Sequence, residues 1–304
     1  MGSGWRSVLI ADGTLRAPWR ILLFLGLGFV LYFVAGFVAL TVAEPPGLEK
    51  EALFWQAIPL AAALGAGWIL LVAVDRRRPG ALGFAWTSHT VREIWAGLLI
   101  GGGALAIAVG ILVAAGWIGF GPDEGTAGLY VRTLLVDLAA FAVAAAFEEA
   151  AFRGYPFQVL VQAIGPIAAT LLASGAFAAA HVANPNASAL GLLNIFLAGV
   201  LLSAAYLRTR SLWFATAVHA GWNWAMASLF DLPVSGLAFF DTPLYDVEER
   251  GPDWITGGVF GPEGGLAATV AFALALVAVL RFPGLDEAPE MRELAPLVDR
   301  TAAA

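Results

Sequence analysis

Long apolar runs separated by short polar connections are the dominant pattern of this chain. Eight of these runs are long enough to cross the hydrocarbon core of a bilayer, about 30 Å thick, as helices. The pattern therefore predicts an all-α fold, a polytopic integral membrane helix bundle with about eight transmembrane helices. The predicted spans lie near residues 21–43, 52–74, 93–118, 132–152, 164–183, 189–207, 212–230 and 265–281.

The composition agrees with a protein that resides in a lipid bilayer. Of the 304 residues, 60% are hydrophobic and 13% are charged, whereas a soluble domain carries about 25% charged residues. No basic patch indicates a nucleic-acid partner. The chain has no cysteine, which excludes disulfides, thiolate metal sites and a thiol nucleophile.

The distribution of lysine and arginine predicts the orientation in the membrane. If the amino terminus lies in the cytoplasm, all but three of the 16 lysines and arginines fall on the cytoplasmic side. The three exceptions are Lys50, Arg132 and Arg250. Because Lys and Arg accumulate in cytoplasmic loops, we expect a multi-pass protein of the cell membrane with both termini in the cytoplasm.

Neither an internal repeat nor a separate soluble domain divides the chain, so residues 1–304 are predicted to form a single membrane domain. The connection 231–264 is acidic and rich in Gly and Pro, and we expect it to be an irregular loop on the outer side. Residues 283–304 carry mixed charges and prolines. They are predicted to form a poorly ordered cytoplasmic tail.

A charged motif follows the apolar run that ends at Phe147. Ionised groups at the centre of a bilayer cost about 2.5–3.5 kcal/mol each by insertion scales, so they persist where they are paired or functional. On a helix, Glu149 and Arg153 stand four residues apart and can form an ion pair that neutralises one carboxylate. Glu148 lies about 100° away around the helix and stays unpaired. A partly desolvated, unpaired glutamate suits the role of a general base near neutral pH.

Two further motifs place histidines inside apolar segments. Phe177 and His181 share one helix face at a spacing of four residues, and so do His219 and Asn223. His219 and Asn223 can therefore direct two hydrogen-bond donors at one point. Asn194, in the sixth predicted span, is interpreted as a residue that forms a helix–helix hydrogen bond.

Together the motifs resemble those of the CPBP family of intramembrane proteases, which includes the type II CAAX prenyl endopeptidases. The family motifs EExxxR, FxxxH and HxxxN occur here in the family's order and on separate apolar segments. They match Glu148-Glu149-x-x-x-Arg153, Phe177-x-x-x-His181 and His219-x-x-x-Asn223. The resemblance covers roughly residues 135–230. It implies an intramembrane endopeptidase that cleaves a membrane-associated peptide or protein substrate.

The same residues can be given chemical roles. Hydrolysis of a peptide bond requires an activated water and hydrogen-bond donors for the developing oxyanion. Glu148 could take the proton from water, and His181 could hold that water and later protonate the leaving amine. His219 and Asn223 could donate to the oxyanion, and the resemblance implies the same assignment. The remaining motif residues are expected to support the site: Glu149, Arg153 and Phe177.

The residues leave two hydrolytic mechanisms open. Glu148, His181 and His219 would form an acceptable zinc set with an open fourth position, although the HExxH signature is absent. Asn223 is a poor zinc ligand but a good oxyanion donor, which favours a metal-free mechanism in which a glutamate activates the water. A divalent metal such as zinc is the alternative cofactor.

The relative depth of Glu148 and His181 is open at this point. If the fourth and fifth predicted spans each cross the membrane separately, the two side chains lie near opposite faces. Residues 132–163 could instead form one long helix that is broken at Gly154 or Pro156. That arrangement would bring Glu148 to the middle of the membrane.

Two functions from other classes also remain open. A catalytically inactive membrane protein, such as an immunity or scaffold factor, could keep the same fold. A proton-coupled transporter could use the buried glutamate and histidine side chains as a proton relay. A transporter would be favoured by an internal inverted repeat, and the sequence contains none that we can find.

Overall fold

The computed structural model describes residues 9–11, 14–42, 48–238 and 241–298. Arg6 and Arg300, which contribute to the predicted orientation, lie outside the described residues, and so does the side chain of Lys50. Residues 299–304 of the predicted tail lie outside them as well.

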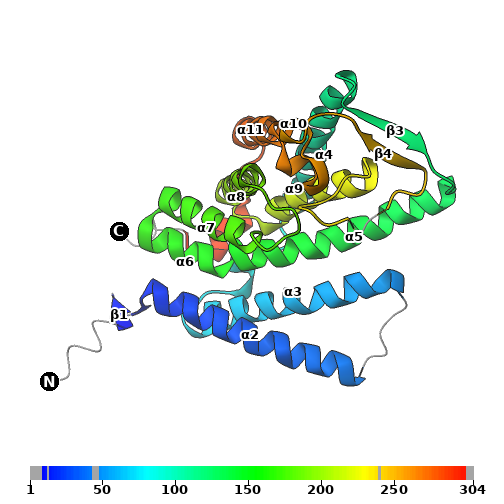
Figure 1. Ribbon diagram of the computed structural model, residues 1–304. Helices are drawn as coiled ribbons and strands as arrows, with labels where there is room; N and C mark the ends of the chain where they lie inside the picture. Colours follow the sequence, from blue (N-terminus) through cyan, green and yellow to red (C-terminus); the bar gives the residue numbers. More distant parts are fainter. Residues whose placement is uncertain (1–8, 12–13, 43–47, 239–240, 299–304) are drawn as a thin grey trace.

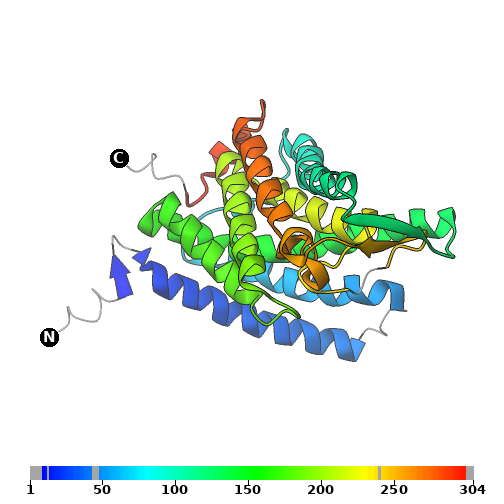
Figure 2. The same cartoon turned by 45° about the horizontal axis from the view of Figure 1, so that its top comes forward.

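Helices make up nearly all of the regular structure, as the apolar runs predicted. The principal helices are α2 (Ala17–Val42), α3 (Leu48–Ala73), α4 (Thr90–Ala114), α5 (Ala127–Phe152), α6 (Tyr155–Ile164), α7 (Pro166–Ala180), α8 (Ala189–Thr209), α9 (Leu212–Trp224) and α11 (Leu266–Arg281). Figure 1 shows α5 through the middle of the molecule, with α2 and α3 along one side of it. The helices α4, α8, α9 and α11 lie on the other side (Figures 1 and 2).

Short elements connect these helices. They are η1 (Pro79–Leu82), the π-helical turn η2 (Ala225–Leu229), α10 (Asp253–Thr256), η3 (Gly258–Phe260), η4 (Pro262–Gly264) and α12 (Pro289–Leu294). Four short strands form two antiparallel pairs. They are β1 (Ile10–Ala11) with β2 (Thr14–Leu15), and β3 (Ile118–Pro122) with β4 (Tyr245–Glu249).

Five helical segments of the described chain are long and apolar enough to cross a membrane: Ala17–Thr41, Leu53–Ala73, Thr90–Ala114, Ala127–Ile164 and Ala189–Thr209. The helices α7 and α11 are apolar but shorter. Every predicted span therefore coincides with a helix, although α9 is neither long nor apolar enough to be counted. Since α9 packs between α4 and α5, most of its surface faces protein. The chain is a membrane protein with multiple membrane-spanning helices.

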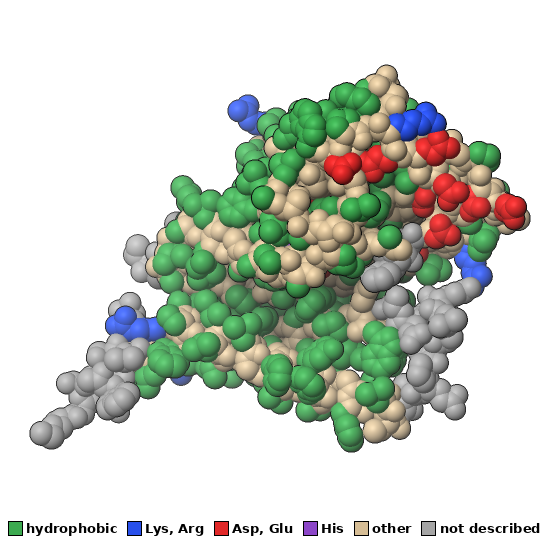
Figure 3. Space-filling model, in the orientation of Figure 1, with side chains coloured by type: hydrophobic (Ala, Val, Ile, Leu, Met, Phe, Trp, Pro, Cys, Tyr) green, Lys and Arg blue, Asp and Glu red, His purple; other side chains and the backbone are tan. Residues whose placement is uncertain are grey.

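The surface has the character expected of a protein embedded in lipid. Large apolar side chains cover much of the face drawn in Figure 3, whereas acidic side chains gather at the end where β3 and β4 lie. The side chains of α2 are mostly exposed, and Phe37 reaches 70% exposure. Contiguous exposed apolar surface of this extent is rare in soluble monomers, so lipid contact accounts for it.

A close helix crossing joins α4 to α9, the helix that carries His219. A Cβ atom added to Gly101 of α4 would lie 2.0 Å from the carbonyl oxygen of Val218, and one added to Gly221 would lie 2.7 Å from the carbonyl oxygen of Leu98. Both distances are far below van der Waals contact. Glycine is therefore required on both helices for the two backbones to approach this closely.

The break between α5 and α6 decides the depth of the motifs. The two helices form one 38-residue apolar segment that is interrupted at Arg153 and Gly154. This agrees with the alternative of one long, broken helix. A Cβ atom on Gly154 would lie 2.3 Å from the carbonyl oxygen of Ala150, so only glycine fits at the break. The returning helix α7 has 15 residues against 10 in α6. The chain thus runs back past the break and brings His181 beside the end of α5.

The connection 231–264 is not the irregular loop that its composition predicted. The strand β4 lies within it and pairs in register with β3, so that Gly119 is opposite Glu248. The short helices α10, η3 and η4 follow. The pairing was missed because the partner strand lies more than a hundred residues earlier in the sequence, mostly in the connection that follows the predicted span 93–118.

The prediction of a poorly ordered tail was wrong for residues 283–298. The side chains of Leu285, Met291 and Leu297 are buried, although their spacing follows no helical period. The side chain of Gln158 on α6 accepts a hydrogen bond from the backbone N–H of Leu297 at 3.0 Å. The tail is therefore packed against the end of the bundle.

Candidate active site

The first motif lies at the carboxyl end of α5 and forms a buried ion pair. Nη1 of Arg153 lies 3.3 Å from Oε1 of Glu149, and both side chains are inaccessible to solvent. Nη2 of Arg153 donates to the carbonyl of Gly199 on α8 at 3.1 Å. The guanidinium carbon lies 4.4 Å from the ring centre of Phe177 on α7. The ion pair expected from the spacing is present, and it joins α5 to α7 and α8.

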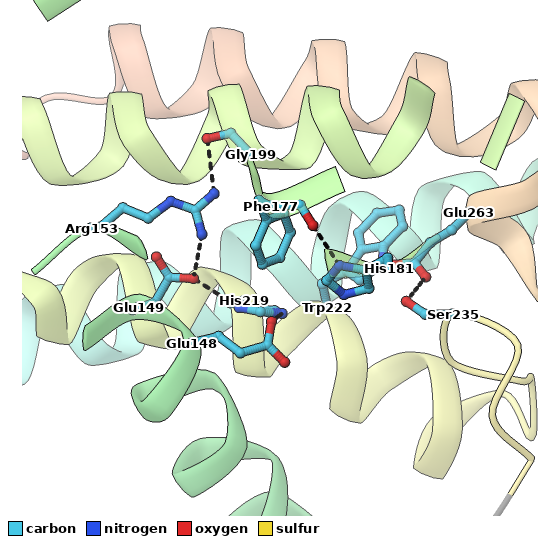
Figure 4. A network of polar contacts seen from close by, with 10 residues as sticks. All are labelled: Glu148, Glu149, Arg153, Phe177, His181, Gly199, His219, Trp222, Ser235 and Glu263. Carbon is cyan, nitrogen blue, oxygen red and sulfur yellow. Dashed lines mark hydrogen bonds and ion pairs between the residues drawn. The ribbon is translucent and has the colours of Figure 1, made fainter. Parts of the chain in front are cut away.

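Glu149 also fixes the orientation of His219. Its Oε1 lies 2.9 Å from Nδ1 of His219, so that the carboxylate is shared between His219 and Arg153 (Figure 4). An ionised carboxylate only accepts hydrogen bonds, so Nδ1 of His219 carries the hydrogen. Sequence spacing revealed the partner four residues away but could not reveal a partner 70 residues away.

The neighbouring side chain, Glu148, is the more exposed of the two glutamates, although its Oε2 is buried. Its Oε2 lies 3.9 Å from Nε2 of His219, which is beyond hydrogen-bond distance. Among the described residues, this oxygen has no hydrogen-bond partner. The side chain keeps 28% of its surface exposed, whereas that of Glu149 keeps none. The two adjacent glutamates thus lie in opposite environments.

The second motif places His181 directly after the last residue of α7. Nδ1 of His181 lies 2.8 Å from the carbonyl oxygen of Phe177, one turn earlier. Since a carbonyl only accepts, this nitrogen is also the donor, and Nε2 is left for other partners. The buried ring of Phe177 lies 4.7 Å from the imidazole of His181 and 6.0 Å from that of His219, centre to centre. Phe177 thus packs against both imidazoles.

One cavity of about 780 Å³ is lined by all four residues predicted to be catalytic: Glu148, His181, His219 and Asn223. They come from α5, α7 and α9, and most of the remaining lining is apolar. Asn223 lies one turn after His219 on α9, and the π-helical turn η2 begins two residues beyond it. Turns of this kind are frequent at functional sites.

A third carboxylate, Glu263 of η4, lines the same cavity and was not found from the sequence. Its Oε1 accepts from Nε1 of Trp222 at 3.1 Å, and its Oε2 accepts from the hydroxyl of Ser235 at 2.6 Å. The side-chain amide of Asn194 donates to the backbone carbonyl of Glu263 at 2.8 Å. The helix–helix hydrogen bond predicted for Asn194 is also present, with Thr269 of α11 at 2.7 Å.

The sequence carries one weak signal for Glu263. Among the acidic residues of the connection, Glu263 alone has glycines close on both sides and lies directly before a predicted span. Several of these glycines have no room for a side chain, since a Cβ on Gly264 would lie 2.6 Å from the carbonyl oxygen of Gly257. Such glycines indicate close backbone packing, and an acidic residue among them is held in place.

The electrostatic environment of Glu263 is set by opposing effects. Burial raises the pKa of the Glu263 carboxyl, while the hydrogen bond from Ser235 and the charges of the nearby histidines His181 and His219 act in the opposite direction. Figure 4 places the Glu263 carboxylate on the His181 side of the site. The cavity therefore has a carboxylate on each side, with Glu148 near His219.

The zinc set considered from the sequence is not assembled in the structure. Within the described ranges, there is no group of three or more His, Cys, Asp or Glu side chains arranged to hold a metal ion. Glu148 and His219 approach each other. The imidazole of His181, however, packs on the ring of Phe177 and does not converge with them on one point.

Comparison with protein families agrees with the motif order. Residues 130–225 match the family model described as type II CAAX prenyl endopeptidase Rce1-like, and this range contains all three motifs. No curated protein matches the chain. Membership of this family implies an intramembrane protease with a protein substrate. The motifs in order, their shared cavity and this match show that residues 130–225 form an Rce1-like type II CAAX prenyl endopeptidase family domain.

Proposed function

We propose that this protein is an intramembrane endopeptidase in which Glu148 activates the attacking water. The observation that carries the proposal is the environment of this carboxylate. Oε2 of Glu148 has no hydrogen-bond partner among the described residues, and it faces Nε2 of His219 across 3.9 Å in a largely apolar cavity. A water molecule at the accessible side of this carboxylate would lose its proton to Glu148 and attack a neighbouring carbonyl carbon.

The oxyanion that forms in this step needs donors that are already oriented. With Nδ1 held by Glu149, His219 directs Nε2 into the cavity beside Glu148. In the imidazolium form Nε2 also carries a hydrogen, which it can donate to the oxyanion. The side-chain amide of Asn223 is the second donor, one turn along the same helix face. Loss of one such donor typically lowers the rate by about 100–1,000-fold.

The leaving amine must receive a proton before the peptide separates. His181 is assigned this step because the carbonyl of Phe177 fixes Nδ1 and leaves Nε2 free to act in the cavity. Nδ1 of His181 already carries the hydrogen that is donated to Phe177, so His181 gives its Nε2 proton as an imidazolium, and the proton that Glu148 takes from water restores that form. The net transfer is therefore one proton from water to the new amino terminus.

The fold supports a single membrane domain that crosses the bilayer eight times, through α2, α3, α4, α5, α7, α8, α9 and α11. An even number of crossings places both termini on one side, and the distribution of lysine and arginine favours the cytoplasm. The connection 231–264 then lies at the outer side, as the lid of the cavity. The substrate is a peptide or protein segment at the membrane.

The test of this function uses the purified full-length chain in detergent and a quenched peptide reporter. Glu148→Ala is expected to lower the cleavage rate by about 100-fold or more while the protein stays folded, because the general base is removed. Glu124→Ala is the matched control, since Glu124 is exposed and does not line the cavity. Cleavage by Glu148→Ala at the control rate would remove Glu148 from the mechanism.

The same preparations decide between the two hydrolytic mechanisms. We propose a metal-free reaction, which the separation of His181 from Glu148 and His219 supports. Active protein is then expected to contain no stoichiometric metal and to keep its rate after treatment with a chelator. Stoichiometric zinc, lost together with activity and restored with it, would establish the metal-dependent alternative.

A further inference from the structure

Gln56 is the polar exception in helix α3. From Leu53 to Ala73 this helix is long and apolar enough to cross the membrane, and its other side chains are apolar apart from the indole nitrogens of two tryptophans. A primary amide in such a helix needs a hydrogen-bond partner, because an unpaired polar group away from water is costly. The sequence of α3 offers no reason for a glutamine at this position.

No hydrogen-bond partner holds this amide in the part of the chain that the structure describes. Oε1 of Gln56 is buried and unpartnered there. The side chain as a whole is half-buried, and it lines the same cavity as Glu148, His181, His219 and Asn223. The amide is therefore free to turn about its terminal bond and to present its donor or its acceptor to the cavity. A buried polar group without a partner requires an explanation, and a ligand of the cavity provides one.

The packing of α3 against α5 gives the level of Gln56 in the cavity. The two helices lie side by side and run in the same direction (Figure 1). A Cβ atom on Gly67 of α3 would lie 3.7 Å from Cβ of Tyr155. Equal numbers of residues back from this contact lead to Gln56 on α3 and to Ala144 on α5, which also lines the cavity. Ala144 is one helical turn before Glu148, about 6 Å along the helix axis.

A peptide that places its scissile carbonyl at Glu148 would pass Gln56. An extended chain covers about 6 Å in two residues, so the amide faces the backbone about two residues from the bond that is cut. A primary amide carries the same kinds of donor and acceptor as a peptide group, and the two can pair. Because most of the cavity lining is apolar, the peptide groups of the substrate have few other partners there.

We propose that Gln56 is a substrate-binding residue that pairs with a backbone peptide group about two residues from the scissile bond. The inference rests on the proposed endopeptidase function and adds a substrate class to it: segments that enter the cavity as extended chain, with an intact peptide group at that position. Since the contact is with the backbone, it does not restrict the side chain of the substrate there. Gln56 takes no part in the proton transfers.

The experiment replaces single peptide bonds of the quenched reporter by esters, which lack the N–H group and have a weaker carbonyl acceptor. Mass spectrometry first identifies the bond that is cut. An ester is then placed in turn at each other bond within three residues of it, and kcat/KM is measured with the full-length protein in detergent. We expect one ester, about two residues from the cut, to lower kcat/KM about tenfold and the others to lower it about twofold or less.

The variant Gln56→Leu removes the amide and keeps a side chain of similar size. The all-amide reporter is expected to lose about tenfold in kcat/KM. The sensitive ester should then cost no more than about twofold, because the bond that it weakens is already absent. The ratio of ester to all-amide rates is independent of the folded fraction. Gln162→Leu is the matched control, since Gln162 accepts from Arg20 at 3.1 Å outside the cavity lining, and it should keep the full ester penalty.

Thermal denaturation separates this role from a structural one. An amide without a partner in the free protein does not stabilise the fold, so Gln56→Leu should be at least as stable as the unmodified protein. An ester profile without a sensitive position, or an ester penalty that Gln56→Leu retains in full, would overturn the inference. The proposed function would still stand if Glu148→Ala is inactive on the same reporters. If the unmodified protein cleaves no reporter, the proposed function fails and the inference fails with it.

Discussion

The helices α5 to α9 and the connection 231–264 both supply side chains to one cavity, but they hold those side chains by different means. On the helices, the spacing of four residues sets the functional groups on one face, as for His219 and Asn223 on α9. In the connection, Glu263 lies on the short helix η4, which is placed by a hydrogen bond from Asn194 of α8 and by close backbone contact with Gly257. The first arrangement is local and the second depends on the whole loop.

The glycines of the two regions show the difference most clearly. In the connection, Gly261 has a φ of +87°, and a Cβ atom there would lie 1.8 Å from the carbonyl oxygen of Pro233. On α7, Gly175 has no atom within 4 Å of the corresponding position. A glycine-rich segment is therefore no proof of flexibility, since glycine is also the residue that lets two backbones touch. The connection belongs to the site because of these contacts.

The largest expected effect concerns the ion pair beneath the helical part of the site. Glu149→Leu leaves Arg153 buried without its partner, which costs about 3–5 kcal/mol of stability, and it also frees the imidazole of His219. The free energy of unfolding is measured by denaturant titration in mixed micelles. We expect Arg153→Met to have a comparable effect, because it leaves the carboxylate of Glu149 buried without a cation.

The double variant separates stability from function at this position. Replacing both Glu149 and Arg153 by apolar residues removes the unpaired charge, so the stability is expected to return to within about 1–2 kcal/mol of the unmodified protein. Cleavage of the peptide reporter should remain lost, because nothing then holds Nδ1 of His219. Additive losses in the double variant would show that the pair is not the source of the effect.

The next effect tests whether the connection is as rigid as its glycines indicate. Gly261→Ala is expected to destabilise the protein by roughly 2 kcal/mol or more, because alanine must both adopt a left-handed backbone and displace Pro233. Gly175→Ala is the matched control in the helical region. It should raise stability by up to about 1 kcal/mol, since alanine favours a helix and has open space there. Thermal denaturation in detergent compares the two directly.

If Gly261→Ala were tolerated as well as Gly175→Ala, the connection would be flexible and Glu263 would not be fixed. The same variant should lower the rate of peptide cleavage, because the connection supplies part of the cavity lining. A variant that loses stability and keeps its full cleavage rate would separate the fold of the connection from the geometry of the site.

The sequence predicted the helices and the chemistry on them because both are encoded locally. Apolar runs set the spans, and spacing of four residues predicted which motif side chains share a face. The sequence could also name Gly154 as a break in the helix, because glycine and proline carry their own backbone preferences. What it left open there was whether the break would bring Glu148 and His181 to one depth.

Four features could not be predicted because each depends on distant partners. The contact of Glu149 with His219 joins two helices that are far apart in sequence. The β3–β4 pair and the buried tail depend likewise on surfaces that exist only after folding. Glu263 is the instructive case, since the acidic composition of the connection suggested an exposed loop while the glycines around Glu263 indicated burial. Acidic and glycine-rich patterns point in opposite directions, and the tertiary contacts decide between them.

The smallest expected effect asks whether glycine contacts in helices differ from those in the connection. Gly101 on α4 faces the carbonyl of Val218 on α9, whereas Gly103 on the same helix has no atom within 4 Å. Substituting alanine at either position gains about 1 kcal/mol of helix propensity. The difference between the two variants therefore isolates the cost of separating α4 from α9. We expect Gly101→Ala to be less stable than Gly103→Ala by about 1–3 kcal/mol, by denaturant titration.

This cost should be lower than that of Gly261→Ala, because a helix can shift as a unit and keep its backbone conformation, whereas the connection must also strain φ. The shift has a functional consequence, since α9 carries both His219 and Asn223. Gly101→Ala is therefore expected to slow peptide cleavage more than its stability alone would suggest, with Gly103→Ala unchanged. A fully active Gly101→Ala protein would mean that the α4–α9 distance does not set the geometry of the oxyanion donors.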